Sequence, residues 1–228
     1  MTSGGHAGRG DLRPRDVAPL GVFVHEAFLD DVTLARVRHA MAAGVGEPAA
    51  VQSRDAWSLA LDTEARVTWE VELPDDLQEA LVTLVNRMLP TFEEASGVAL
   101  ESCEAVAALR YPAGSFYGPH RDVSDTPDEH GLHRREVSIV IFLNDGAGAG
   151  ADFAGGRLRL YGLTGSEDDG VDVVPEAGTL VAFPSRLRHE VTRVTQGERQ
   201  SLVTWLLAAN GPECPDVSPG GDGDGRRG

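Results

Sequence analysis

The chain has no lysine, and this absence removes several classes of enzyme at once. All twenty of its basic side chains are arginine. A Schiff-base lysine, a pyridoxal-phosphate attachment and the lysine of a phosphate-binding Walker loop are therefore excluded. An anion held inside a pocket would have to meet arginine, whose planar guanidinium suits a carboxylate well.

Cysteine and long apolar runs are also scarce. The two cysteines, Cys103 and Cys214, lie far apart, so the sequence indicates neither a disulfide framework nor a zinc site with CxxC spacing. The N-terminal residues show no apolar segment typical of a secretory signal, and no run approaches membrane-spanning length. We therefore expect a cytoplasmic protein that does not associate with a membrane.

Positive charge is in short supply. The 228 residues include 36 acidic and 20 basic side chains, which gives a formal net charge of −16. Such a charge disfavours nucleic acids and anionic membrane surfaces as partners. The length and a hydrophobic content of 41% suit one globular domain with a sizeable core, and they leave the oligomeric state open.

The pattern along the chain predicts a helical first part and a β-rich second part. Segments rich in Gly, Arg and Asp predict disordered tails at 1–17 and 211–228, around a folded unit at 18–210. Apolar spacing predicts one helix capped by Asp30 or Asp31, and a second that starts at Asp76 with a capping box to Glu79.

After residue 100 the apolar spacing changes to that of strands separated by turns. The strand-like runs are 103–111, 116–122, 136–143, 156–161, 171–174, 179–184, 188–194 and 200–208. The run 136–143 is apolar on both faces and should be a central strand. This order predicts a mainly β (α+β) fold, a double-stranded β-helix or jelly roll with N-terminal helices packed on one sheet.

Three residues in this part could form a metal site. His120 and Asp122 are two positions apart, so on one strand their side chains share a face, and His189 arrives from a later strand. Two imidazoles and one carboxylate with open positions are the facial triad of non-haem Fe(II) oxygenases. The alternative for His120 and Asp122 is a salt-linked pair at a strand end.

Several strings together carry a resemblance to a known family. The strings are "RYPAGSFYGPHRD", "VSIVIFLND", "GGRLRLY", "PEAGTLVAFPSRLRHEV", "GERQSLVTW" and the earlier "VFVHEAFLDD". Residues 18–208 resemble the Fe(II)/2-oxoglutarate-dependent dioxygenases, in particular the prolyl 4-hydroxylase-like branch. The resemblance implies that His120, Asp122 and His189 hold Fe(II), that 2-oxoglutarate and O₂ take the remaining positions, and that ascorbate is a candidate reductant.

The resemblance also implies residues for the cosubstrate. Arg199, ten positions after His189, would pair with the distal carboxylate of 2-oxoglutarate, and otherwise it is a surface arginine in a turn. Ser201 could add a hydroxyl there or simply pack on a strand. Tyr111 and Tyr117 could hydrogen-bond the cosubstrate or be half-buried core residues. Tyr117 lies an odd number of positions from His120, so it faces the site only if a bulge intervenes.

Two departures from the branch bear on the substrate. Many prolyl 4-hydroxylases use a lysine where this chain has Arg199, and the oxygen-sensing members place a tyrosine near Phe142, which has no hydroxyl. The carboxylate site must therefore be built differently, and peptidyl proline as the substrate is in doubt. The carboxylate of Asp122 favours hydroxylation over halogenation, because halogenating relatives lack it.

The mouth of the expected site is less defined. The polar loop 123–134 is a candidate lid and specificity element. Arg135 could meet a substrate carboxylate or be a surface arginine that flanks a strand, and Trp205 is expected in the core. Three hypotheses follow for the function: hydroxylation of a small molecule, amino acid or biosynthetic intermediate; hydroxylation of a prolyl or other residue in a protein or peptide; or a catalytically silent metal-binding barrel or sensor.

Overall fold

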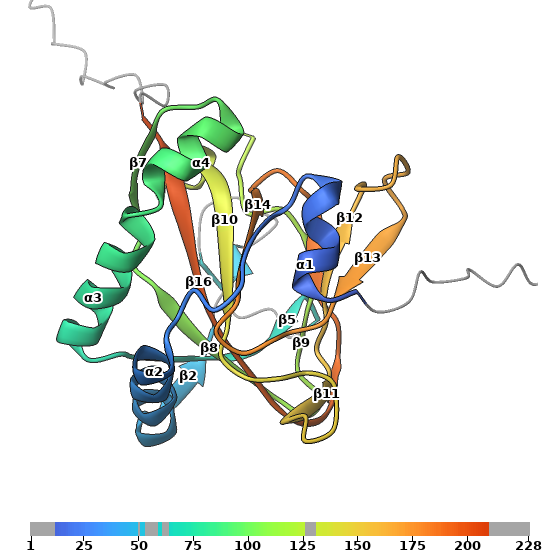
Figure 1. The fold of residues 1–228 in the computed structure, drawn as a ribbon. Coiled ribbons are helices and arrows are strands. Elements are labelled where there is room, and N and C mark those ends of the chain that lie inside the picture. The colour runs from blue at the N-terminus through green and yellow to red at the C-terminus, as the bar shows by residue number, and fades with distance from the viewer. Residues whose placement is uncertain (1–11, 50, 53–58, 61–63, 126–130, 210–228) are drawn as a thin grey trace, which may run out of the picture.

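The computed structural model describes residues 12–49, 51–52, 59–60, 64–125 and 131–209. The expected tail 211–228, residues 1–11 of the expected N-terminal tail, and positions 126–130 of the candidate lid lie outside the described residues. These residues form two facing β-sheets with short helices beside them (Figure 1).

The larger sheet has nine strands and runs through the middle of the molecule. Its main path has the order β1-β14-β10-β16-β8-β6-β2, and β7 and β11 also pair with β16. The strands are β1 (Phe23–His25), β2 (Gly46–Pro48), β6 (Trp69–Val71), β7 (Leu100–Cys103), β8 (Ala107–Pro112), β10 (Arg135–Phe142), β11 (Phe153–Gly155), β14 (Leu180–Pro184) and β16 (Val194–Ala208).

The smaller sheet has five strands in the order β13-β12-β15-β9-β5. They are β5 (Arg66–Val67), β9 (Phe116–His120), β12 (Leu158–Tyr161), β13 (Gly170–Val173) and β15 (His189–Val191). A separate pair is formed by β3 (Val51–Gln52) and β4 (Leu59–Ala60). All pairs within the two sheets are antiparallel, and the strands cross between them as in a double-stranded β-helix, so the predicted fold class is confirmed.

The helices are short and lie mostly on one side of the large sheet (Figure 1). They are α1 (Pro14–Val17), α2 (Asp31–Ala43), α3 (Asp75–Asn86), α4 (Leu89–Ser96) and the 3₁₀ turns η1 (Ala18–Leu20) and η2 (Leu132–Arg134). One core cluster joins Met41 of α2, Leu81 of α3 and Phe92 of α4 to Ile139 and Ile141 of β10. The helices α2, α3 and α4 thus cover the outer face of the large sheet and leave its inner face to the other sheet.

A second core cluster fills the space between the sheets. It joins Val140 and Phe142 of β10 to Leu158 and Leu160 of β12. Successive side chains of a strand alternate between its faces, so the two clusters together bury both faces of β10. The strand pairs with β14 on one edge and with β16 on the other. This confirms the prediction of a central strand.

The N-terminal boundary of the folded unit differs from the expected residue 18. Leu12 forms a bridge with Val173, and Val17 is fully buried in the cluster between the sheets. Figure 1 shows α1 beside β12 and β13. The Gly, Arg and Asp composition that predicted a tail therefore extends past the point where apolar residues begin to pack.

The helix starts were predicted with mixed success. The Asp30 carboxylate accepts a hydrogen bond from the Thr33 N–H at 2.7 Å, as expected for the cap of α2. The second helix begins at Asp75 after Pro74, and no side chain caps it, so the capping box from Asp76 is wrong. Pro74 has the fixed backbone φ that suits a helix start, so the helix begins at Asp75, one residue earlier than predicted.

The strand boundaries show which signals were missed. The run 103–111 is divided into β7 and β8, and β11 was not predicted because it lies in a segment rich in glycine. The last strand is longer than the predicted run 200–208, because β16 begins at Val194. It pairs first with β11 and then with β8 and β10. Glycine at position 197 has a φ of +68°, which bends the strand where its partners change.

Candidate active site

The side chains of His120, Asp122 and His189 converge between the sheets. Their ligand atoms all lie within 4.8 Å of one another. His120 ends β9 and His189 begins β15, and the two residues are direct partners in the ladder of these strands. The Asp122 carboxylate reaches both rings, with Oδ1 3.3 Å from His120 Nε2 and Oδ2 3.3 Å from His189 Nε2.

The backbone fixes the tautomer of both histidines. His120 Nδ1 donates to the Gly118 carbonyl and His189 Nδ1 donates to the Leu187 carbonyl, each at 2.9 Å. A carbonyl oxygen only accepts, so both Nδ1 atoms carry the hydrogen and both Nε2 atoms keep a free lone pair toward Asp122. A hydrogen bond from the second ring nitrogen to a carbonyl oxygen orients an imidazole for metal binding.

Asp122 enters the site from a loop and not from the strand. The strand β9 ends at His120, so the expected alternation along 116–122 is wrong in its last step. Asp122 is instead held by its N–H, which donates to the Ser185 carbonyl at 3.0 Å. Its Oδ2 accepts from the Ser138 hydroxyl at 2.6 Å, and Ser138 Oγ lies 3.0 Å from Ser185 Oγ.

The electrostatics favour the metal-binding forms of His120 and Asp122, whereas His189 would release a proton when a metal binds. Burial lowers the pKa of His120, and the adjacent His189 lowers it further. Burial alone would raise the pKa of Asp122, but His189 and His120 outweigh it and hold that pKa well below its usual range. For His189 burial is also outweighed, because the Asp122 carboxylate raises the pKa of the ring. The residues present therefore fit a divalent metal ion bound by two neutral imidazoles and one carboxylate.

Tyr117 reaches the site because the strand contains a bulge. In the ladder of β9 and β15, His120 pairs with His189 but Tyr117 pairs with Val191, so two residues of β9 between these pairs face one residue of β15. The Tyr117 ring stacks on the His120 ring with a centroid distance of 3.6 Å. The bulge that the "YGP" segment allowed is present, and both residues line the same cavity.

Arg199, Ser201 and Tyr111 come together deeper in the cavity. Arg199 and Ser201 alternate onto the inner face of β16, and Tyr111 is the ladder partner of Arg199 on β8. The Arg199 side chain is 1% exposed, donates to the Ser201 hydroxyl at 2.8 Å, and lies 4.9 Å from the centroid of the Tyr111 ring. Gly156 leaves room for it, because a Cβ there would lie 3.0 Å from Arg199 Cδ.

The charge of Arg199 has no counterion in the described part of the chain. No carboxylate of the described residues pairs with it, and its buried Nε has no hydrogen-bond partner. Burial lowers the pKa of Arg199, although Tyr111 opposes this shift. A buried cation with an open donor is costly unless an anion joins it, so this end of the cavity fits a ligand carboxylate.

The cavity that contains these residues has a volume of about 460 Å³. Its wall on β16 extends from Arg199 to Trp205. Arg135 and Glu104 form a charged region beside Trp205. Arg135 forms two hydrogen bonds to the Glu104 carboxylate, at 2.7 and 2.6 Å, and its guanidinium lies 3.5 Å from the centroid of the Trp205 ring. Trp205 was expected in the core, and the structure places it on the cavity wall instead.

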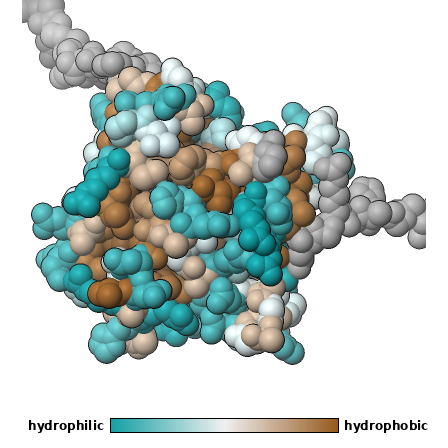
Figure 2. Space-filling view, in the orientation of Figure 1, coloured by the Kyte–Doolittle hydropathy of each residue, from teal (hydrophilic) through white to brown (hydrophobic). Residues whose placement is uncertain are grey.

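A larger hollow of about 1270 Å³ lies elsewhere, between α2 and the start of α3. It includes the exposed Val32 and Val45 and none of the three clustered residues. Figure 2 shows apolar residues gathered toward the helical side of this view and hydrophilic residues around its periphery. We place the chemistry in the smaller cavity, because among the described residues this cavity contains both the metal-binding set and the unpaired cation Arg199.

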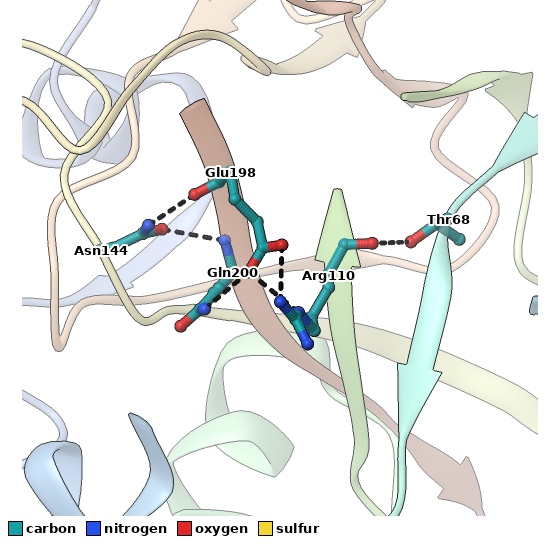
Figure 3. A network of polar contacts seen from close by, with 5 residues as sticks. All are labelled: Thr68, Arg110, Asn144, Glu198 and Gln200. Carbon is teal, nitrogen blue, oxygen red and sulfur yellow. Dashed lines mark hydrogen bonds and ion pairs between the residues drawn. The ribbon is translucent and has the colours of Figure 1, made fainter. Parts of the chain in front are cut away.

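Sequence reasoning missed the residues that support the site. Ser138 is a single hydroxyl in the apolar run "VSIVIFL", and a polar residue at an inward position was a usable signal. Asn144 was also missed: its side chain contacts the backbone of β16 on both sides of Arg199 (Figure 3). No local pattern revealed that contact, because it joins residues far apart in the chain.

A two-histidine, one-carboxylate cluster on a double-stranded β-helix defines the class of non-haem Fe(II) oxygenases. Comparison with known proteins makes this specific. Residues 106–207 match the model of the 2OG-Fe(II) oxygenase superfamily. These findings support the 2OG-Fe(II) oxygenase superfamily, and its prolyl 4-hydroxylase-like branch, for this chain.

The relatives are hydroxylases by name. The chain is 35% identical over 96 residues to a PKHD-type hydroxylase of a Synechococcus strain, and 37% identical over 108 residues to one of Sphingopyxis alaskensis. These segments cover 42% and 47% of this chain, and 39% and 44% of those proteins. The chain thus matches less than half the length of these curated relatives.

Solved structures match over most of the chain. A prolyl-4-hydroxylase of Pseudomonas putida has a TM-score of 0.63 and 26% identity, and the match covers 86% of this chain and 96% of that one. A prolyl hydroxylase of Trichoplax adhaerens, solved with a peptide fragment of a hypoxia-inducible factor, has a TM-score of 0.61 and 18% identity over 86% and 87% of the two chains. The second likeness concerns the fold alone.

The described helices place one further limit on the architecture. None of them combines the length and the apolarity that a bilayer crossing requires.

Proposed function

We propose that this chain is an Fe(II)- and 2-oxoglutarate-dependent hydroxylase of an unactivated C–H bond. The substrate would be a small molecule, an amino acid or a biosynthetic intermediate, with succinate and CO₂ as coproducts. The observation that carries the proposal is one cavity that holds both the His120, Asp122 and His189 cluster and the unpaired Arg199. A metal-binding protein without this chemistry would not need a buried cation beside its metal.

Each residue has a defined task in this proposal. His120, Asp122 and His189 would hold Fe(II) on one side and leave the other side open for reagents. Arg199, with Ser201 and Tyr111, would bind the distal carboxylate of 2-oxoglutarate and so orient its 2-oxo acid group toward the metal. When bound, the iron and 2-oxoglutarate supply the oxidant: one oxygen atom of O₂ enters succinate and the other enters the substrate.

The remaining wall of the cavity would receive the substrate. Glu104, Arg135 and Trp205 lie there, and Tyr117 stacks on His120 from the side of β9. The paired charges beside an aromatic ring suit a polar substrate. A reducing cytoplasm would keep the iron ferrous, and ascorbate would serve as the reductant after uncoupled turnover.

A prolyl or other residue of a peptide is the second candidate substrate. The likeness to the Pseudomonas putida prolyl-4-hydroxylase favours it, since that match covers 96% of that chain at 26% identity. Phe142 distinguishes this chain from the oxygen-sensing members, because the carboxylate pocket here would be built with Tyr111 and Ser201 around Arg199.

The test is spectroscopic first and chemical second. Anaerobic addition of Fe(II) and then 2-oxoglutarate should give a weak visible charge-transfer band, and His189→Ala should abolish it. Exposure to air should then release succinate. If the wild-type protein shows no band and no succinate, it is a catalytically silent barrel and the proposal is wrong. Screening small molecules and proline-containing peptides for coupled succinate release, with mass spectrometry for one added oxygen, separates the two substrate classes.

A further inference from the structure

A polar network surrounds the backbone of β16 on both sides of Arg199 (Figure 3). Its members are Thr68, Arg110, Asn144, Glu198 and Gln200. Glu198 and Gln200 flank Arg199 in the strand, so their side chains lie on the opposite face from the guanidinium in the cavity. The network therefore contacts the strand that carries Arg199 without contacting the cavity.

Asn144 makes the most direct contacts in this network. Its Nδ2 donates to the Glu198 carbonyl at 2.8 Å, and its Oδ1 accepts from the Gln200 N–H at 2.9 Å. One side chain, 4% exposed, thus binds the peptide groups before and after Arg199. The regular ladder between β10 and β16 ends at Phe142 and Ser201, so Asn144 takes the place of the backbone partner that β10 no longer supplies.

The contact between Asn144 and β16 lies next to an irregular part of the strand. The strand bends at Gly197, one residue before the segment that Asn144 holds. On the other side of β16, Arg110 donates two hydrogen bonds to the Glu198 carboxylate, each at 2.9 Å. Arg199 itself contacts the uncharged side chains of Ser201 and Tyr111 and no carboxylate of the described residues, so its direction is set by its backbone and not by a counterion.

We propose that Asn144 is a positioning residue that aims Arg199 at its ligand by binding the peptide groups on both sides of it. The inference rests on the proposed binding of 2-oxoglutarate by Arg199. Asn144→Ala would leave two partly buried peptide groups without this partner and let the strand shift. The guanidinium would then meet the distal carboxylate in a poorer geometry, while the metal-binding residues, which lie on β9, on the loop after it and on β15, would keep theirs.

The experiment measures ligand binding to the full chain loaded with Ni²⁺, which does not support turnover. Calorimetry gives the Kd of 2-oxoglutarate and of 2-oxobutyrate, which has the same 2-oxo acid group and lacks the distal carboxylate. Asn144→Ala should raise the Kd of 2-oxoglutarate about tenfold, the scale of one lost neutral hydrogen bond, and leave the Kd of 2-oxobutyrate unchanged. In an Arg199→Ala background, Asn144→Ala should have no further effect.

The controls separate positioning from a general loss of structure. Thr68→Val removes the hydrogen bond from Thr68 to the Arg110 carbonyl, at the far end of the network, and should leave both Kd values unchanged. Asn144→Asp retains the acceptor for Gln200 and loses the donor to Glu198, so it should weaken 2-oxoglutarate binding even if Asn144→Ala fails to fold.

Three outcomes would overturn the inference. These are equal weakening of the two acids, the same effect with and without Arg199, or an unchanged Kd in both Asn144 variants. A wild-type protein that binds Ni²⁺ but not 2-oxoglutarate would instead overturn the proposed function, and the inference with it.

Discussion

The two ends of the active-site cavity hold positive charge in different ways. At the inner end, Arg199 is 1% exposed and has no carboxylate among the described residues. At the outer end, Arg135 has a bidentate carboxylate partner in Glu104 and the face of Trp205 beneath it. Arg199 and Trp205 are six positions apart on the inner face of β16, about 20 Å at the usual rise of a strand.

The difference teaches how such a cavity divides its tasks. Arg135 already has a carboxylate partner in the free protein, so a new anion would add little binding energy because it would have to displace Glu104. A buried cation that lacks a partner destabilises the free protein, and a bound carboxylate offsets this destabilisation. We therefore expect the inner end to bind one obligatory anion and the outer end to vary with the substrate.

The largest expected effect tests the inner end. Arg199→Met should raise the Kd of 2-oxoglutarate at least ~100-fold, since charge-assisted hydrogen bonds contribute about 1.5–3 kcal/mol each. The same change should stabilise the ligand-free protein by about 1–3 kcal/mol, because it removes an unpaired buried charge. Calorimetry and chemical denaturation check the two parts. A destabilised variant would show that Arg199 has a partner in the free protein.

The next effect makes the outer end resemble the inner one. Glu104→Gln removes the countercharge of Arg135 and should destabilise the protein by about 1–2 kcal/mol, less than for a fully buried pair, since Glu104 is 26% exposed. It should also create a site for small carboxylates, seen as stabilisation by acetate in thermal melts. Trp205→Phe, which retains both charges, is the matched control. If acetate stabilises wild type equally, Arg135 is already open and the contrast between the ends is wrong.

A smaller effect lies between the two ends, at the metal-binding residues. Ser138 donates to Asp122 Oδ2, so Ser138→Ala leaves one carboxylate oxygen without its donor. Metal affinity should fall about tenfold, the lower range for an outer-shell partner. Equilibrium dialysis with Co²⁺ measures it, and Ser185→Ala, one step further from the carboxylate, should lose less. Equal losses in both variants would show that the serines act by packing alone.

The contrast between the ends also shows what the sequence could predict. His120, Asp122, His189 and Arg199 stand in strings whose residue types and spacing are sufficient, and the structure brings all four to one cavity. The central strand was predictable as well, because "VSIVIFL" is apolar on both faces. Local chemistry with a fixed spacing is readable before any coordinates.

The outer end was not readable in that way. Glu104 pairs with Arg135 across 31 positions, and Trp205 approaches from a third strand, so no spacing signals the set. Arg135 could be named only as a choice between a substrate contact and a surface residue. The loop position of Asp122 and the bulge at Tyr117 were likewise decided by the pairing of β9 with β15 and by the Ser185 carbonyl, which are tertiary contacts.

The smallest effect at neutral pH concerns Tyr117, whose charge state belongs to neither end. Burial raises its pKa to about 12 from an ordinary value of 10.0, so the phenol stays neutral and adds no charge to the cavity. A pKa raised in the folded state contributes stability that is complete below the unfolded pKa and is lost as the pH rises through the folded one. Wild type should therefore lose on the order of 2 kcal/mol between pH 10 and pH 12 that Tyr117→Phe does not lose. Denaturation at several pH values, with Tyr161→Phe for comparison, measures the difference. Parallel losses in wild type and Tyr117→Phe would mean that the phenol ionises freely, and the region beside His120 would then carry a negative charge that the comparison of the two ends omits.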